Sequence, residues 1–163
     1  MRLLLGHDEL VAEWIRRRIP HMANTDGFGQ CVTMGVIGGD DGATMLGAVV
    51  FHNYLPVNRS IHWSAAAVTP NWLNRRIITD ILRYPFKQLD CVRITAVIPR
   101  RNRRSRDFQE RFGFKHEGTM RREFVGDDAC VYGLLRSEWN KSRFNLDRPQ
   151  QGIAAEPASV GIH

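Results

Sequence analysis

A strand, a helix and a second strand are encoded in close succession by Val97-Ile-Pro-Arg-Arg-Asn102-Arg-Arg-Ser105-Arg-Asp-Phe108-Gln-Glu-Arg-Phe-Gly113-Phe114-Lys-His-Glu117-Gly118. An apolar run comes first, and Asn102 then offers a side-chain cap for a helix over 102–112. Phe108 and Phe112 lie one turn apart on that helix, and Gly113 ends it. The segment therefore predicts a helix held between two strands.

Alternating apolar patterns and turn residues predict the elements on either side. Strands are expected over 1–5, 31–37, 44–54, 60–68, 91–98, 116–124 and 129–136, and further helices over 8–19 and 73–88, with a helical turn at 137–141. Pro85 kinks or ends the helix over 73–88. This order predicts one α/β domain, a mixed central sheet of six to seven strands with helices on both faces.

The domain is expected over residues 1–144, followed by a flexible tail over 145–163 that is rich in Pro, Gln and Gly. The chain has 163 residues, of which 43% are hydrophobic and 25% charged, which is typical of a globular protein. No apolar run approaches the roughly 18 residues that span a bilayer, and the first residues do not read as a signal peptide. A cytoplasmic protein without a membrane partner is expected.

The cysteines Cys31, Cys91 and Cys130 are widely spaced and odd in number. They form no Cys-x-x-Cys pair, so neither a metal site nor a disulfide framework is indicated. Each lies in an apolar run, where a free cysteine behaves as a small hydrophobic residue.

The formal net charge of +6 predicts an anionic partner. Five arginines fall within seven residues, and Arg75-Arg76 form a second cluster; the five are Arg100, Arg101, Arg103, Arg104 and Arg106. Two separated basic clusters suit a ligand with two phosphate centres at least as well as a polymer.

The segment around Asn102 resembles the GCN5-related N-acetyltransferases (GNAT), especially the branch that acetylates ribosomal-protein N-termini and its phage and prophage relatives. That branch has an Asn at the helix start, a Ser or Ala three residues later, Gly-Phe at the helix end and Glu-Gly soon after. The ending Tyr132-Gly-Leu-Leu-Arg-Ser-Glu138-Trp139 matches as well, and the resemblance covers about residues 1–140. It implies a splay between the fourth and fifth strands and acetyl-coenzyme A (acetyl-CoA) as co-substrate, with no metal.

The same resemblance implies where the coenzyme binds. The pantetheine arm is expected against the helix that begins at Asn102 and against free N–H groups of the fourth strand, which gives the set Asn102, Arg104, Ser105, Phe108, Ala66, Ala67 and Val68. Relatives hold the pyrophosphate in a glycine-rich turn, but residues 68–76 contain no glycine here. Asn74, Arg75 and Arg76 at a helix start are the expected replacement.

Direct transfer needs a base for the amine and an acid for the leaving thiolate. His62, whose ordinary pKa lies near 6.5, is the hypothesised base, with Glu117 and Glu123 as rivals and a plain strand histidine as the alternative. Many relatives carry the acid as a Tyr at the position of Gln109, and a carboxamide cannot replace it. The thiolate is then protonated by water, Ser105 or Tyr132.

The acceptor is expected to be an amine: a protein N-terminus, a lysine or a small molecule, contacted by loops 20–30 and 52–60. Two other interpretations stay open. One is a relative that has lost catalysis and acts as a binding or regulatory protein; the other is a nucleic-acid-binding module that uses residues 100–106 with Trp72 and Arg75-Arg76. A homodimer paired through exposed strand edges is compatible with the fold.

Overall fold

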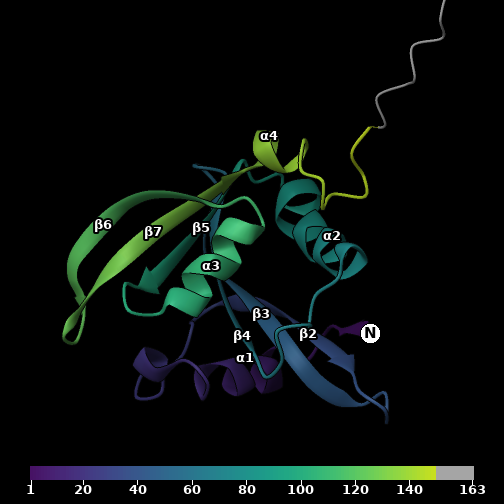
Figure 1. Ribbon diagram of the computed structural model, residues 1–163, viewed down its shortest axis with the longest axis horizontal. Helices are drawn as coiled ribbons and strands as arrows, with labels where there is room; N and C mark the ends of the chain where they lie inside the picture. The colour runs from purple at the N-terminus through teal and green to yellow at the C-terminus, as the bar shows by residue number, and fades with distance from the viewer. Residues whose placement is uncertain (150–163) are drawn as a thin grey trace, which may run out of the picture.

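The computed structural model describes residues 1–149 as one sheet with helices on both faces (Figure 1). Its strands are β1 (Arg2–Leu4), β2 (Cys31–Gly38), β3 (Thr44–Leu55), β4 (Ser60–Ala67), β5 (Arg93–Pro99), β6 (Lys115–Phe124) and β7 (Asp127–Leu135). Its helices are α1 (Asp8–Arg16), α2 (Arg75–Arg83), α3 (Arg103–Arg111) and α4 (Arg136–Trp139), with short helical turns η1 (Pro20–Met22) and η2 (Tyr84–Gln88). The predicted element order is confirmed.

The seven strands lie in the order β1-β2-β3-β4-β5-β7-β6, and only the pair β4–β5 is parallel. That parallel pairing covers just three residues of each strand and ends where His62 meets Thr95. Residues 63–67 of β4 and 96–99 of β5 continue without pairing to each other. The predicted mixed sheet and the predicted splay between its fourth and fifth strands are both confirmed.

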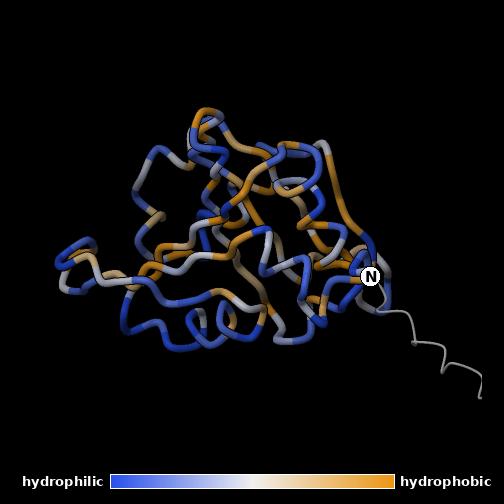
Figure 2. Tube along the Cα trace, turned by 90° about the horizontal axis from the view of Figure 1, so that it is seen from above, coloured by the Kyte–Doolittle hydropathy of each residue, from blue (hydrophilic) through white to orange (hydrophobic). Residues whose placement is uncertain are grey.

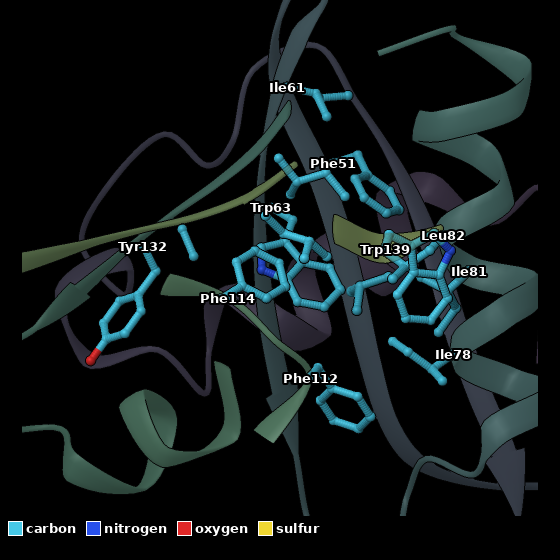
Figure 3. Close-up of a cluster of buried hydrophobic side chains, with 14 of the residues drawn as sticks. Phe51, Ile61, Trp63, Ile78, Ile81, Leu82, Phe112, Phe114, Tyr132 and Trp139 are labelled. Carbon is cyan, nitrogen blue, oxygen red and sulfur yellow. The ribbon is translucent and has the colours of Figure 1, made fainter. Parts of the chain in front are cut away.

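The sheet has two faces with separate apolar clusters. Trp63, Ile81 and Phe114 belong to the larger cluster, on what we call the α2/α3 face (Figure 3). Val11 and Ile15 of α1 form a smaller cluster on the opposite face, the α1 face, with Ala48 and Val50 of β3. Figure 2 shows hydrophobic segments gathered inside and hydrophilic ones outside. Because side chains alternate along a strand, β4 presents successive residues to opposite faces.

Side-chain caps and a proline set the ends of the two helices on the α2/α3 face. Asn74 Oδ1 accepts a hydrogen bond from the Ile77 amide at 2.9 Å and begins α2. Asn102 Oδ1 accepts from the Ser105 amide at 3.1 Å and begins α3. At Pro85, which has no N–H to donate, α2 gives way to a π-helical turn, as the sequence predicts.

Residues 145–149, which the sequence assigns to the tail, lie against α2. The Leu146 amide donates to Thr79 Oγ1 at 3.1 Å, and Asp147 bridges Arg83 and Lys87. Asn145 is buried and donates to the Trp139 carbonyl. The helix-packed part of the chain thus extends past 144, and the remainder of the predicted tail, 150–163, lies outside the described residues.

Cys91 and Cys130 are buried thiols, and Cys31 is half-buried. Within residues 1–149, no cluster of three or more His, Cys, Asp or Glu side chains is arranged to hold a metal ion. No helix in this part of the chain combines the length and apolarity that crossing a membrane requires.

Candidate functional site

The splay between β4 and β5 leaves backbone groups of β4 without a cross-strand partner. The Val68 amide donates to the Leu46 carbonyl at 3.0 Å, so it points to β3. Because amides alternate in direction along a strand, Ala66 also points to β3, whereas Ala65 and Ala67 point into the splay. The prediction that the amides of Ala66 and Val68 are free is therefore wrong, and those of Ala65 and Ala67 face the gap.

The start of α3 borders the splay on the α2/α3 face. Asn102 is exposed, and since its Oδ1 caps the helix, its amide Nδ2 is left to bind a ligand. Ser105 and Phe108 are half-buried and follow at one-turn intervals, so they lie on the same side of α3. Arg104 is exposed on the same helix. The structure brings these predicted contacts together.

An aromatic stack joins α3 to the loop before α2. Phe108 stacks on Trp72 with ring centroids 5.7 Å apart and on Trp63 of β4 at 6.3 Å. Trp72 is only 3% exposed and covers Gly47 of β3, where a Cβ would meet its ring atom Cδ2 at 2.5 Å. Packing of Trp72, rather than a glycine-rich turn, thus fixes the loop over 68–74.

The start of α2 offers a basic but partly used anion site. Asn74 spends its side-chain oxygen on the Ile77 amide, so its role as a phosphate donor is reduced to its NH₂ group. Arg75 and Arg76 are exposed, and as the first two helical residues they have amides that no helical carbonyl accepts. Arg76 lies 4.0 Å from Asp80, a weak surface pair.

A polar patch lies on the α1 face beside the end of the β4–β5 pairing. His62 is directly opposite His52 of β3, with ring centroids 5.8 Å apart, and His52 Nε2 lies 3.1 Å from Ser64 Oγ. Thr95 of β5 is the register partner of His62. We call His52, His62, Ser64 and Thr95 the histidine patch; it places the hypothesised base at the mouth of the splay.

An ion pair borders the histidine patch. Arg93 of β5 donates to both carboxylate oxygens of Glu117, at 2.9 and 2.5 Å, and its Nε donates to Thr95 Oγ1 at 2.8 Å. Gly133 makes room, since a Cβ there would meet Arg93 Nη1 at 2.8 Å. The Arg93 hydrogen bonds lower the pKa of Glu117, which makes this rival base weak. Glu123 is exposed on β6.

Both histidines of the patch are held neutral. Burial, and secondarily the neighbouring His62, lowers the pKa of His52 to about 4. Burial, and secondarily the Arg93 charge, lowers the pKa of His62. At neutral pH His62 therefore has a ring nitrogen able to accept a proton.

Folding should lose stability as the pH falls from about 6.5 towards 4. In that window the unfolded chain binds a proton at His52 and the folded chain does not, so the free energy of unfolding decreases with acidification. The upper limit for His52 is about 3 kcal/mol, from about 1.4 kcal/mol per pKa unit. Urea unfolding at pH 7 and pH 4.5 should show a smaller loss for His52→Gln than for wild type. The exposed His7→Gln serves as control, and an unchanged loss in His52→Gln would refute the assignment.

Tyr132 lies away from the histidine patch. Its ring is buried on the α2/α3 face, and its hydroxyl donates to Glu110 Oε1 at 2.9 Å (Figure 3). Burial, and secondarily the Glu110 bond, raises the pKa of Tyr132. The hydroxyl is thus committed to a carboxylate, which makes Tyr132 a poor acid for a leaving thiolate.

Gln109, at the position where many relatives carry a Tyr, has a structural partner. It is buried, and its side-chain oxygen accepts the indole N–H of Trp63 at 3.1 Å. The carboxamide thereby satisfies a buried indole that apolar residues would leave unpaired.

Two loop contacts cover the histidine patch side of the molecule. Phe28 lies against His52, with ring centroids 5.3 Å apart, and His21 of η1 lies 4.4 Å from Phe124 at the end of β6. These contacts bring the predicted acceptor loop 20–30 to the patch. His52 was expected only as a loop residue, and Arg93 and Thr95 were missed. Their signal is the alternation of polar residues within the apolar run 91–98.

Known proteins with similar sequence or structure are acetyltransferases by name. The chain is 28% identical over 103 residues to "Putative ribosomal N-acetyltransferase YdaF" of Bacillus subtilis, which covers 59% of this chain and 56% of that relative. A structure of an acetyltransferase from T. thermophilus matches with a TM-score of 0.58 at 22% identity, over 68% of this chain and 62% of that one. A chimeric spermidine N-acetyltransferase SpeG from Vibrio cholerae matches with a TM-score of 0.65 at 16% identity, over 85% and 97%. No family model matches the chain.

The fold is therefore that of the GCN5-related N-acetyltransferases, and the resemblance predicted from the Asn102 segment is confirmed. The chain spans 56% of the length of the curated relative that it matches. The fold and the relatives are thus established, and what this chain catalyses is treated below.

Proposed function

We propose that the protein transfers the acetyl group of acetyl-CoA to an amine by direct attack. The observation that carries the proposal is the end of β4–β5 pairing at His62 and Thr95, which leaves backbone donors of β4 facing a gap. The start of α3 lies on one face of this gap and a neutral histidine on the other. Such a gap suits a thioester passing from a coenzyme groove to an acceptor side.

Acetyl-CoA would supply the activated acyl group, and residues on the α2/α3 face fit its two halves. Asn102 Nδ2 and the Ser105 hydroxyl suit the amide groups of pantetheine, and the half-buried Phe108 provides an apolar wall. The first amides of α2 and the side chains of Arg75 and Arg76 suit the pyrophosphate. This end of the groove departs most from the family, because it lacks glycine.

The acceptor nitrogen attacks the thioester carbonyl carbon from the α1 face, and the carbon–sulfur bond breaks. His62 takes the proton that the nitrogen loses. The amides of Ala65 and Ala67 are placed to donate to the developing oxyanion. Because the Tyr132 hydroxyl is bound to Glu110, Ser105 or water protonates the thiolate.

Two features favour a protein N-terminus or another monoamine over a polyamine as acceptor. The net charge of +6 repels a polycation, and the carboxylate beside the histidine patch, Glu117, is neutralised by Arg93. The ribosomal relative agrees with this choice, whereas the spermidine N-acetyltransferase shares the fold at 16% identity. The three free thiols fit a reducing compartment, and we propose that the reaction is cytoplasmic.

Coenzyme A release and thermal melting together test the proposal. With acetyl-CoA at 100 times its Kd, binding should add about 2.7 kcal/mol of stability. Thiol release should then depend on an added amine, with peptides carrying a free N-terminus faster than spermidine. Neither a melting shift nor thiol release would contradict the proposal.

A second candidate is a binding or regulatory protein that has lost catalysis. Gln109 favours it, because the position of the usual acid is taken by a residue bound to Trp63. A melting shift with acetyl-CoA but no thiol release across the amine panel would select this candidate.

A further inference from the structure

A basic basin of about 590 Å³ lies between the turn after β5, helix α3 and the β6–β7 hairpin. Its charged lining is Arg100, Arg101, Arg106, Arg122, Asp127 and Asp128. Four guanidinium groups and two carboxylates leave a local formal charge of +2. The function proposed above uses none of these side chains.

The two carboxylates of the basin already hold backbone groups. Asp127 accepts from the amides of Arg101, at 3.0 Å, and of Asp128, at 2.9 Å. Asp128 accepts from the Arg122 amide at 2.8 Å and approaches Arg100 Nη1 only to 3.7 Å. The aspartates therefore fix the two turns and do little to neutralise the arginine side chains.

The guanidinium groups of Arg101, Arg106 and Arg122 form no ion pair with any residue in 1–149. Arg106 Nε is buried, yet within this part of the chain it has no hydrogen-bond acceptor. A buried donor without an acceptor is costly, by about 1–3 kcal/mol. An oxyanion in the basin would supply the acceptor.

Arg106 and the proposed coenzyme groove lie on different sides of α3. Arg106 is two residues from Phe108, which is about 200° around a helix with 3.6 residues per turn. Phe108 stacks on Trp63 and Trp72, whereas Arg106 lies towards the β6–β7 hairpin. An anion bound by Arg106 is therefore separate from the pantetheine contacts.

We propose that this basin binds a phosphate or diphosphate group of a ligand other than the coenzyme, held by Arg101, Arg106 and Arg122. Guanidinium groups bind phosphate oxygens in pairs, and several of them around one basin suit a doubly charged group. The basin is a binding site only, and its existence does not depend on acetyl transfer.

Calorimetric titration with inorganic pyrophosphate, at saturating coenzyme A to block the start of α2, tests the site. Arg106→Gln should weaken pyrophosphate binding about tenfold or more, because a charge-assisted hydrogen bond contributes about 1.5–3 kcal/mol. Arg103→Gln is the matched control: its side chain is 83% exposed on the same helix and outside the basin, so the affinity should stay within about twofold. No binding to wild type, or equal binding to Arg106→Gln, overturns the proposal.

Two further measurements keep the result interpretable. Arg106→Lys, which keeps the charge without the Nε donor, should also bind more weakly and should melt like wild type, which separates loss of the site from misfolding. Coenzyme A and its 3′-dephospho form are compared as competitors of pyrophosphate. If only coenzyme A competes, the basin takes the coenzyme's own 3′-phosphate, and the separate site is refuted. If coenzyme A does not bind at all, the proposed function fails while the pyrophosphate titration remains valid.

Discussion

Replacing His62 with alanine should lower the rate of acetyl transfer by about 10² to 10⁴, the usual contribution of a positioned general base. His62 lies at the end of the β4–β5 pairing and is held neutral by burial and by Arg93. Because its pKa is lowered, wild type should keep its rate from neutral pH to below 6.5 and lose it as His62 becomes protonated. Initial rates of thiol release between pH 5 and 8 measure both effects.

The control for this prediction is a histidine on the other side of the sheet. His116 packs against Tyr132, on the α2/α3 face, with ring centroids 5.4 Å apart, and His116→Ala should keep the wild-type rate and pH profile. Both variants should melt close to wild type, since neither ring is fully buried. A full rate with an unchanged pH profile in His62→Ala would exclude His62 as the base.

Gly47→Ala should destabilise the fold by about 1–3 kcal/mol through overpacking. The added Cβ would meet Trp72 Cδ2 at 2.5 Å and Cγ at 2.9 Å, and a buried indole stacked on Phe108 cannot move aside. In a Trp72→Leu background the same substitution should cost little, because the ring that it strikes is gone. Urea unfolding of the two single variants and the double variant should give a coupling energy of about 1 kcal/mol or more.

Gly118→Ala is the matched control, because a Cβ at Gly118 meets nothing within 4 Å. It should change the free energy of unfolding by less than about 0.5 kcal/mol. Additive effects of Gly47→Ala and Trp72→Leu would show that Trp72 does not cover β3, and that the loop over 68–74 is held in another way.

The fold was predictable because its local signals agree with one another. Asn102 and Gly113 bound a helix, Pro85 breaks another, and alternating residues give the strands, so each element was found within a few residues. The splay came from the resemblance, and the register of β4 against β5 confirms it. These features depend on neighbours in sequence or on a family pattern.

The site was predicted less completely, because its geometry depends on register and on contacts between distant segments. Which amides of β4 are free follows from the bond between Val68 and Leu46, and the sequence does not reveal that bond. The engagement of Tyr132 by Glu110 depends on how α3 lies over β7. Trp72 was assigned to a possible nucleic-acid surface and instead is buried against Phe108.

Amide NMR of the ¹⁵N-labelled protein during titration with acetyl-CoA tests whether the coenzyme enters the gap between β4 and β5. The resonances of Ala65, Ala67, Asn102 and Ser105 should shift and saturate together, while that of Val11, in the α1 cluster, stays in place. Unchanged resonances at Ala65 and Ala67 with saturating acetyl-CoA, or shifts confined to the arginine basin, would contradict an acetyltransferase working at this splay.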